Sequence, residues 1–154
     1  MTRTAYYSSP IGPIVLSFDD TSLTGLRFAS PAAGSNGGSI ADNSPLTACI
    51  RWLDLYFSGR QPDFTPPINL RGTAFQQRVW HELLTIPYGQ TVTYGEIARR
   101  VGCRSAQAVG GAVGRNPIAL IVPCHRVIGS DGTLTGFAYG LRRKQYLLQL
   151  EQSN

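Results

Sequence analysis

The N-terminal third of the chain alternates apolar and polar residues in short runs. Two such runs cover residues 14–18 and 23–28, and the Asp-Asp-Thr-Ser segment between them has the side chains that favour turns. Alternation with a period of two is typical of half-buried strands, so the pattern predicts an antiparallel hairpin or meander. Residues 32–43 are rich in Gly, Ser, Ala and Asn, and we expect a mobile loop there.

A helix is predicted after this loop. Ser44 is a good N-cap because its hydroxyl can accept from a backbone N–H of the first turn, and Pro45 suits the first helical position because no N–H is needed there. Apolar residues then recur at helical spacing on one face as far as the stop at Gly59: Ile50, Leu53 and Phe57. Residues 61–71 contain three prolines, which predict an extended linker.

The chain beyond the linker has helical periodicity. Thr73-x-x-Gln76 is a capping box, and it opens a predicted helix that ends before Pro87. The apolar face of this helix is formed by Phe75, Val79 and Leu83. A last helix is predicted over residues 141–151, with Leu141 and Leu148 on its apolar face.

Between these helices, two short helical segments follow each other closely. Thr93-x-x-Glu96 is a second capping box whose helix, with Tyr94, Ile97, Ala98 and Val101 on its apolar face, stops near Gly102. Ser105 caps the next helix, residues 106–114. The pair resembles a helix-turn-helix, although antiparallel helix pairs of bundles share this spacing.

The second helix of this pair is unusually rich in small residues. Each glycine in a helix costs about 1 kcal/mol relative to alanine, and this helix contains Gly110, Gly111 and Gly114. We therefore expect another surface to approach it closely, such as a sugar-phosphate backbone or a groove wall.

The two halves together predict an α+β fold. A small N-terminal antiparallel sheet with one helix and the linker would occupy residues 1–69, and a C-terminal helical domain with the helix-turn-helix would occupy residues 70–154. A chain of 154 residues with 42% hydrophobic residues can fill one core or two small ones. No apolar run approaches the ~20 residues that a membrane helix needs, and the N-terminus lacks a signal-peptide pattern, so we expect no membrane partner and a cytoplasmic, nucleoid-associated protein.

Charge and cysteine content narrow the chemistry further. The formal net charge of +5 favours a polyanionic partner. One arginine group surrounds the small-residue helix, namely Arg99, Arg100, Arg104 and Arg115, and a second basic group, Arg142, Arg143 and Lys144, is predicted to be a solvated surface. Three cysteines without paired spacing argue against a disulfide framework, and no metal site is predicted because the two histidines lack ligand partners.

The strongest chemical signal is the sequence Pro123-Cys124-His125 after the apolar residues 119–122. A thiol beside an imidazole can be a nucleophile whose pKa the protein controls, although two buried structural residues would have the same sequence. Neighbours in sequence do not readily face each other, so we expect His125 to reach Cys124 through a bridging water.

The residues around Cys124 closely resemble the active-site region of the O6-alkylguanine-DNA alkyltransferases. The resemblance rests on residues 116–129 and 132–137, and upstream on residues 72–76, 79–80, 86–89, 93–95 and 108–112, in the same order. It implies a suicidal repair protein that binds duplex DNA, flips an alkylated guanine out of the stack and takes its alkyl group irreversibly on Cys124, with no cofactor and as a monomer.

The resemblance also implies roles for individual residues. Cys124 would be the nucleophile, His125 and Glu151 would form a proton relay with a water, and Tyr94 would contact the phosphate and the guanine. Asn116 would be the asparagine of the hinge before the active-site strand, and the Phe137 ring would pack on the base. The Ala138 N–H and the Val127 carbonyl would bond to the base, and Tyr139 would lie at the lip of the pocket. The DNA contacts would come from Arg104, Ala106, Gln107, Gly110, Gly111 and Arg115.

Two positions depart from the family pattern. Gln107 stands where the family often has an intercalating arginine, and glutamine has neither its charge nor its stacking plane. Tyr139 stands where many members have glycine, and its ring is expected to narrow the pocket entrance. Arg126 is predicted to tie the active-site turn to its surroundings. Two alternatives stay open: a non-catalytic module that binds alkylated DNA, and a cysteine hydrolase.

Overall fold

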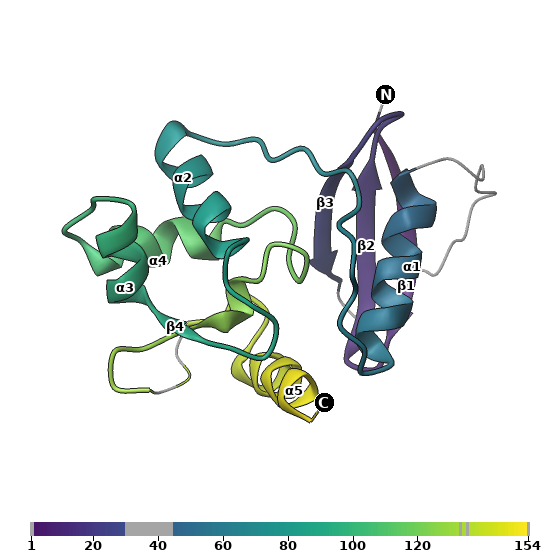
Figure 1. Ribbon diagram of the computed structural model, residues 1–154. Helices are drawn as coiled ribbons and strands as arrows, with labels where there is room; N and C mark the ends of the chain where they lie inside the picture. Colours follow the sequence, from purple (N-terminus) through teal and green to yellow (C-terminus); the bar gives the residue numbers. More distant parts are fainter. Residues whose placement is uncertain (1, 30–44, 133, 135, 154) are drawn as a thin grey trace. The chain divides into compact units, whose positions relative to one another are not determined.

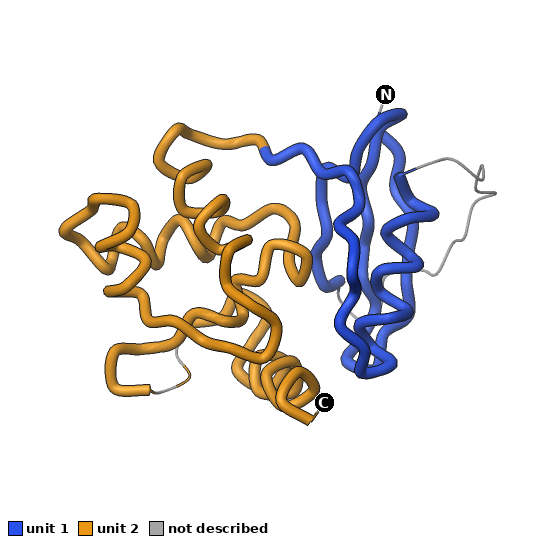
Figure 2. The backbone as a smooth tube through the Cα atoms, viewed as in Figure 1, with its two compact units in different colours: residues 1–70 blue, residues 71–154 orange. Residues whose placement is uncertain are grey.

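The computed structural model describes residues 2–29, 45–132, 134 and 136–153. The chain divides into two compact units, residues 1–70 and 71–154 (Figure 2). The sequence predicted a division one residue earlier, between residues 69 and 70. Ser44 and the predicted loop over residues 32–43 lie outside the described residues.

The first unit contains a three-stranded antiparallel meander in the order β1-β2-β3 (Figure 1). Its strands are β1 (Arg3–Ser9), β2 (Gly12–Phe18) and β3 (Leu23–Phe28). The two predicted strands are confirmed as β2 and β3, while β1 was not predicted. In the turn between β2 and β3, Asp19 Oδ1 accepts hydrogen bonds from the backbone N–H groups of Thr21 and Ser22, which explains why these polar residues end one strand and begin the next.

Helix α1 (Pro45–Phe57) contacts all three strands of this sheet. Its buried side chains are Pro45, Leu46, Cys49, Trp52, Leu53 and Tyr56. Of the three residues predicted to form the apolar face of this helix, only Leu53 is buried. Ile50 and Phe57 are half-buried, because they lie at the edge of the face that contacts the sheet. The Phe57 ring stacks on Tyr7 of β1, with 6.3 Å between the ring centroids.

The predicted linker has no helix, and it also adds to the sheet. Leu23 N–H donates to Pro67 O at 2.7 Å, and Asn69 N–H donates to Leu23 O at 2.9 Å. These bonds form a parallel bridge between Leu23 and Ile68. The C-terminal part of the proline-rich segment is therefore attached to the first residue of β3.

The second unit begins with α2 (Ala74–Leu83). Its capping box is complete, because Gln76 N–H donates to Thr73 Oγ1 and Thr73 N–H donates to Gln76 Oε1. Helices α3 (Tyr94–Arg100) and α4 (Ala106–Gly114) follow, joined by a turn in which Gly102 has φ 72°. The buried Trp80 indole donates to Ala112 O at 2.8 Å and so ties α2 to α4.

Both short helices have side-chain caps. Thr93 Oγ1 accepts from Glu96 N–H, and Ser105 Oγ accepts from Ala108 N–H. The Glu96 carboxylate pairs with Arg100 at 3.0 Å, so only the threonine half of the predicted second capping box is seen. The structure thus contains the predicted helix pair, with α4 as its second member.

A two-stranded parallel sheet, which the sequence did not predict, organises the centre of this unit. Strand β4 (Val92–Thr93) pairs with β5 (Val127–Ile128), which directly follows the 3-10 turn η1 (Cys124–Arg126). Tyr94 begins α3 immediately after β4, so this pairing brings it near the turn that holds Cys124. The pairing therefore connects two segments that lie 35 residues apart in the sequence, since Val92 pairs with Val127.

Helix α5 (Leu141–Gln152) closes the second unit. Its buried side chains are Lys144, Leu147 and Glu151, whereas Leu141 is 50% exposed. The predicted apolar face was wrong in this respect, because the side of α5 that contacts η1 carries two charged residues. No helix in the described part of the chain is long and apolar enough to cross a membrane.

Candidate active site and nucleic-acid interface

Cys124 follows a compact turn formed by residues 116–122. The Asn116 side chain holds this turn together: its amide N–H donates to Val122 O at 2.8 Å, and its Oδ1 accepts from Ile118 N–H at 3.0 Å. Leu120 has φ 71°, a value that favours glycine, which shows how tightly the chain bends here. Asn116 thus closes the turn that leads to Cys124.

The Cys124 thiol is buried, and its surroundings act on its ionisation in opposite directions. Burial raises the pKa of Cys124, whereas a hydrogen bond from Asn116 and the charge of Lys144 lower it. Burial dominates because a thiolate loses more hydration than it regains from these two groups. The thiol is therefore protonated in the free protein at neutral pH, with partners in place that would stabilise a thiolate once it forms.

His125, Glu151 and Arg126 form a buried cluster behind the thiol. His125 Nε2 lies 2.5 Å from Glu151 Oε2. Arg126 donates to both carboxylate oxygens, at 2.8 Å through Nε and 3.2 Å through Nη2, and its Nη1 donates to Ile86 O. Gly89 N–H donates to Glu151 Oε1 at 3.0 Å. Although Glu151 lies near the end of the chain, it is not an exposed terminal carboxylate, since the residue is 1% exposed.

The same contacts set the charges of the cluster. Burial opposes ionisation of Glu151, but the hydrogen bonds and charges of His125 and Arg126 outweigh it and lower its pKa to about 2. Burial lowers the pKa of His125, and the Glu151 carboxylate only partly offsets this effect. The result is an ionised carboxylate beside a neutral imidazole, which can accept a proton.

Lys144 is the largest departure from the sequence-based expectation. It was predicted to lie on a solvated basic surface, but its side chain is fully buried and Nζ donates to Val127 O at 2.5 Å. Nζ also lies 5.9 Å from the centroid of the Tyr94 ring. Burial lowers the pKa of Lys144, and the nearby Cys124 raises it. The sequence held one signal for this position, because Lys144, Leu147 and Glu151 share one helical stripe.

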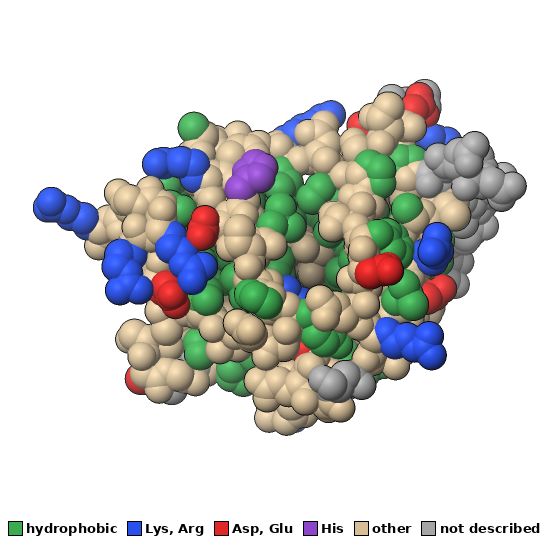
Figure 3. Space-filling model, viewed as in Figure 1, with side chains coloured by type: hydrophobic (Ala, Val, Ile, Leu, Met, Phe, Trp, Pro, Cys, Tyr) green, Lys and Arg blue, Asp and Glu red, His purple; other side chains and the backbone are tan. Residues whose placement is uncertain are grey.

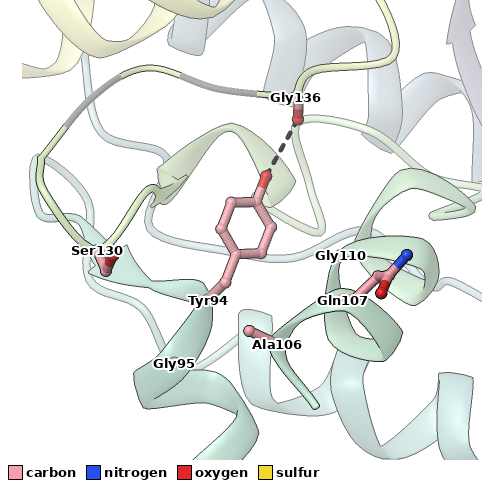
Figure 4. Close-up of a pocket in the computed structure, with 7 residues that line it drawn as sticks. All are labelled: Tyr94, Gly95, Ala106, Gln107, Gly110, Ser130 and Gly136. Atoms are coloured by element: carbon pink, nitrogen blue, oxygen red, sulfur yellow. Dashed lines mark hydrogen bonds between the residues drawn. The ribbon is translucent and has the colours of Figure 1, made fainter.

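Tyr94 crosses the space between the α3–α4 pair and the segment that follows Ser130 (Figure 4). Its hydroxyl donates to Gly136 O at 3.1 Å. Burial and the nearby Cys124 raise the pKa of Tyr94, which keeps the phenol protonated. The other predicted base contacts follow in the chain: the rings of Phe137 and Tyr139 meet edge to face at 5.5 Å.

Two separate hollows meet at Gly136, whose carbonyl accepts the hydrogen bond from the Tyr94 hydroxyl. A groove of about 520 Å³ is lined by Tyr94, Gly95, Ala106, Gln107, Gly110, Ser130 and Gly136. A cavity of about 10 Å³ is lined by Val113, Gly114, Asn116, Cys124, Gly136, Phe137, Ala138 and Tyr139. The structure thus gathers Asn116, Phe137, Ala138 and Tyr139 around the thiol, whereas Val127 is placed through its bond to Lys144.

Helix α4 presents small residues on its outer face. Ala106, Gln107 and Gly111 are exposed, and a side chain at Gly111 would meet nothing within 4 Å. Gly110 differs, because a Cβ there would lie 3.9 Å from the Tyr94 ring. The predicted close approach of another surface thus has open space at Gly111, while a Cβ at Gly110 would make only an ordinary contact with the Tyr94 ring.

Arg side chains gather over the α3 end of this unit (Figure 3). Arg99, Arg104 and Arg115 are exposed, whereas Arg100 pairs with Glu82 and Glu96. An exposed cationic rim beside a helix of small residues fits a polyanion whose backbone comes close to α4. Among the described residues, no group of three potential metal ligands occurs, and all three cysteines are free thiols.

These features define a class: an α+β protein that sets one buried thiol, backed by a His-Glu-Arg cluster, beside a helix-turn-helix. Two family models cover nearly the whole chain, the ribonuclease-like domain of 6-O-methylguanine DNA methyltransferase over residues 2–70 and the DNA binding domain of the same family over residues 74–153. The chain belongs to the 6-O-methylguanine DNA methyltransferase family.

Individual relatives agree with this assignment. The methylated-DNA–protein-cysteine methyltransferase of Mycobacterium leprae is 49% identical over 94% of this chain and 88% of the relative. The protein of that name from Methanosarcina acetivorans is 44% identical over 97% of both chains. The crystal structure of Mycobacterium tuberculosis OGT in complex with DNA has a TM-score of 0.86 at 46% identity, over 97% of this chain and 92% of that chain.

Proposed function

We propose that this protein repairs DNA by transferring a methyl group from the O6 atom of guanine to its own Cys124. The observation that carries the proposal is the buried Cys124 thiol, which a single small hollow connects to Asn116, Phe137, Ala138 and Tyr139. Relatives at 44–49% identity bear the name of this activity. The partner is double-stranded DNA that contains alkylated guanine, and the protein acts as a monomer without a cofactor.

The reaction follows from the charge states of the site. His125, neutral and oriented by Glu151, accepts the Cys124 proton through one water. The thiolate attacks the methyl carbon, so that a carbon–sulfur bond forms as the carbon–oxygen bond breaks. The electron pair goes to guanine, which takes a proton from the Tyr94 hydroxyl. A thioether does not hydrolyse under cellular conditions, so each molecule reacts once.

Base recognition would use groups around the same hollow. Phe137 would stack on the flipped base, the Ala138 N–H would donate to the guanine oxygen, and the carbonyls of Cys124 and Val127 would accept from the exocyclic amino group. Lys144 already donates to Val127 O. A carbonyl oxygen has two lone pairs, so one is still available for guanine.

DNA binding would use the outer face of α4. Ala106, Gly110 and Gly111 would allow the groove wall to approach, Arg104 and Arg115 would contact phosphates, and Gln107 would fill the space left by the flipped nucleotide. We also propose that the protein is located in the cytoplasm, on the nucleoid when it is bound to DNA, because the free thiols need a reducing compartment.

Methyl transfer from a duplex that carries one O6-methylguanine with a labelled methyl group tests the proposal. Wild-type protein should take up label, and Cys124→Ser should take up none while it still binds the duplex, because a hydroxyl is far less nucleophilic than a thiolate. Cys103→Ser is the matched control and should react like wild type. Label on Cys124→Ser would refute the assignment, and uptake of label by wild type would exclude a non-catalytic binding module.

A further inference from the structure

The hydrogen bond between Tyr94 and Gly136 stands between the two hollows of the site. The groove of about 520 Å³ lies on one side of it and the cavity of about 10 Å³ at Cys124 on the other, and Gly136 lines both. Figure 4 shows the Tyr94 ring spanning the distance from α3 to Gly136. Among the described lining residues the two hollows share only Gly136, so a base that moved from the groove to the sulfur would pass the residue that the Tyr94 hydroxyl holds.

The cavity at Cys124 is too small for the substrate. A cavity needs roughly 10–15 Å³ to hold one water molecule, and this one measures about 10 Å³. A purine base has two fused rings and is many times larger than a water. The residues that cover Cys124 must move before guanine can bind.

The cover is the short segment Gly136 to Gly140, which we name the strap. A glycine with positive φ stands at each end, with φ 58° at Gly136 and 94° at Gly140. Within the strap, Gly140 N–H donates to Phe137 O at 3.0 Å, and Arg143 of α5 donates to Tyr139 O at 3.4 Å. Such glycines can take up a backbone rotation that other residues resist, so the strap has pivots at both ends.

We infer that the strap is a gate over Cys124 and that the Tyr94 hydroxyl is its latch. The latch opens when an incoming base offers that hydroxyl an acceptor in place of Gly136 O. The identity of the incoming base rests on the proposed function, whereas the gate itself is a property of the free protein. A thiol that reacts only once gains from such a gate, because small electrophiles are kept from it until a purine arrives.

Alkylation of Cys124 by iodoacetamide, without DNA, tests the gate. Cys103, half-buried in the turn between α3 and α4, serves as an internal reference in the same peptide digest. Tyr94→Phe removes the latch and should raise the Cys124 to Cys103 labelling ratio about three- to tenfold, the value of one hydrogen bond. Tyr146→Phe on α5, the matched control, should leave the ratio at the wild-type value. An unchanged or lower ratio in Tyr94→Phe would overturn the inference.

A second variant strains the strap without removing the Tyr94 hydroxyl. Gly136→Ala leaves the hydroxyl in place but puts a Cβ on a residue with φ 58°, which strains the closed strap, so the ratio should rise again. The increase should hold at every pH between 6 and 9. If the labelling ratio plotted against pH shifted its midpoint but did not rise on its high-pH plateau, the variant would have changed the ionisation of the thiol, and this result would contradict a gate. Methyl transfer by wild type, measured separately, reports on the proposed function alone.

Discussion

Lys144 lies in the interior of the protein although two basic residues precede it, of which Arg142 is exposed and Arg143 is half-buried. Its ammonium group donates to Val127 O and lowers the pKa of the Cys124 thiol. A buried charge is costly, so it is retained where it acts on another group. In this site it supplies a positive charge for the thiolate that the reaction creates.

Replacement of Lys144 by Met should therefore impair the reaction more than the fold. Methionine fills a similar volume and removes a desolvated charge, which offsets the about 1–3 kcal/mol lost when Val127 O loses its donor. The thiol pKa should rise, and each unit of increase costs about tenfold in thiolate at fixed pH. We expect at least about a tenfold slower methyl transfer with a similar melting temperature, whereas Arg142→Met on the exposed side should transfer normally. Equal transfer rates in the two variants would show that the ammonium has no part in the reaction.

Gln107 is exposed at the start of α4 and lines the groove. An extrahelical base leaves a hole in the duplex that costs a few kcal/mol, and arginine stacks there better than glutamine. Gln107→Arg should raise the repair rate on duplex DNA by on the order of tenfold, or ~1.4 kcal/mol, and should hardly change the reaction with free modified guanine. Gln90→Arg adds the same charge away from α4 and controls for the net charge. A duplex rate that stays equal or falls would show that position 107 does not fill the hole.

Tyr139 lines the cavity at Cys124, and its ring meets that of Phe137. Bulky adducts should therefore be excluded more strongly than a methyl group. Tyr139→Gly removes the ring and opens space for a bulky group, so we expect the rate of inactivation by free O6-benzylguanine to increase about tenfold or more. Methyl transfer from DNA should change much less. Parallel changes for both substrates would argue against a steric role.

At the scale of elements, α5 supplies the groups that fix the protonation states of the site. It carries both Lys144 and Glu151 to the turn that contains Cys124 and His125. Because the pKa of His125 is lowered, the unfolded chain takes up its proton first as the pH falls. His125 thus stabilises the fold at pH values above its ordinary pKa of 6.5, and this contribution is lost as the pH falls below that value.

The expected result is a free energy of unfolding that decreases between about pH 6.5 and 5 in wild type. His125→Asn should show a smaller slope over this range, although it is less stable at pH 7. His81→Asn, on the exposed side of α2, is the matched control and should keep the wild-type slope. Urea titrations at a series of pH values give these slopes. A His125→Asn slope as steep as that of wild type would contradict a buried neutral imidazole.

In residues 71–154, the sequence predicted where the helices lie better than it predicted which of their faces are buried. Caps are local, so Thr73, Thr93 and Ser105 could be identified from their own neighbours. The β4–β5 pair has two residues in each strand and joins distant segments, so no periodicity could reveal it. The face of α5 was missed for a different reason: hydrophobic periodicity assigns Lys144 and Glu151 to the surface, and only their partners in space keep them inside.

At the scale of the whole molecule, the two units have different tasks. All predicted site residues lie in residues 71–154, while the first unit has its own sheet and its own buried helix face. The Cys49 thiol of that unit is buried, which raises its pKa to about 12, so it is unreactive at neutral pH. Of the buried thiols, only Cys124 lies beside a cation and a base.

The central claim is that one alkyl group moves from DNA to Cys124, once per molecule. The most direct measurement is mass spectrometry of the intact protein and of its peptides after reaction with an excess of duplex that carries a single O6-methylguanine. The account predicts that the mass increases by one methyl group and no more, that the methyl group is on the Cys124 peptide, and that the DNA repaired equals the protein added. A methyl group on Cys49 or Cys103, an unmodified protein beside repaired DNA, or more than one repaired site per protein would contradict it.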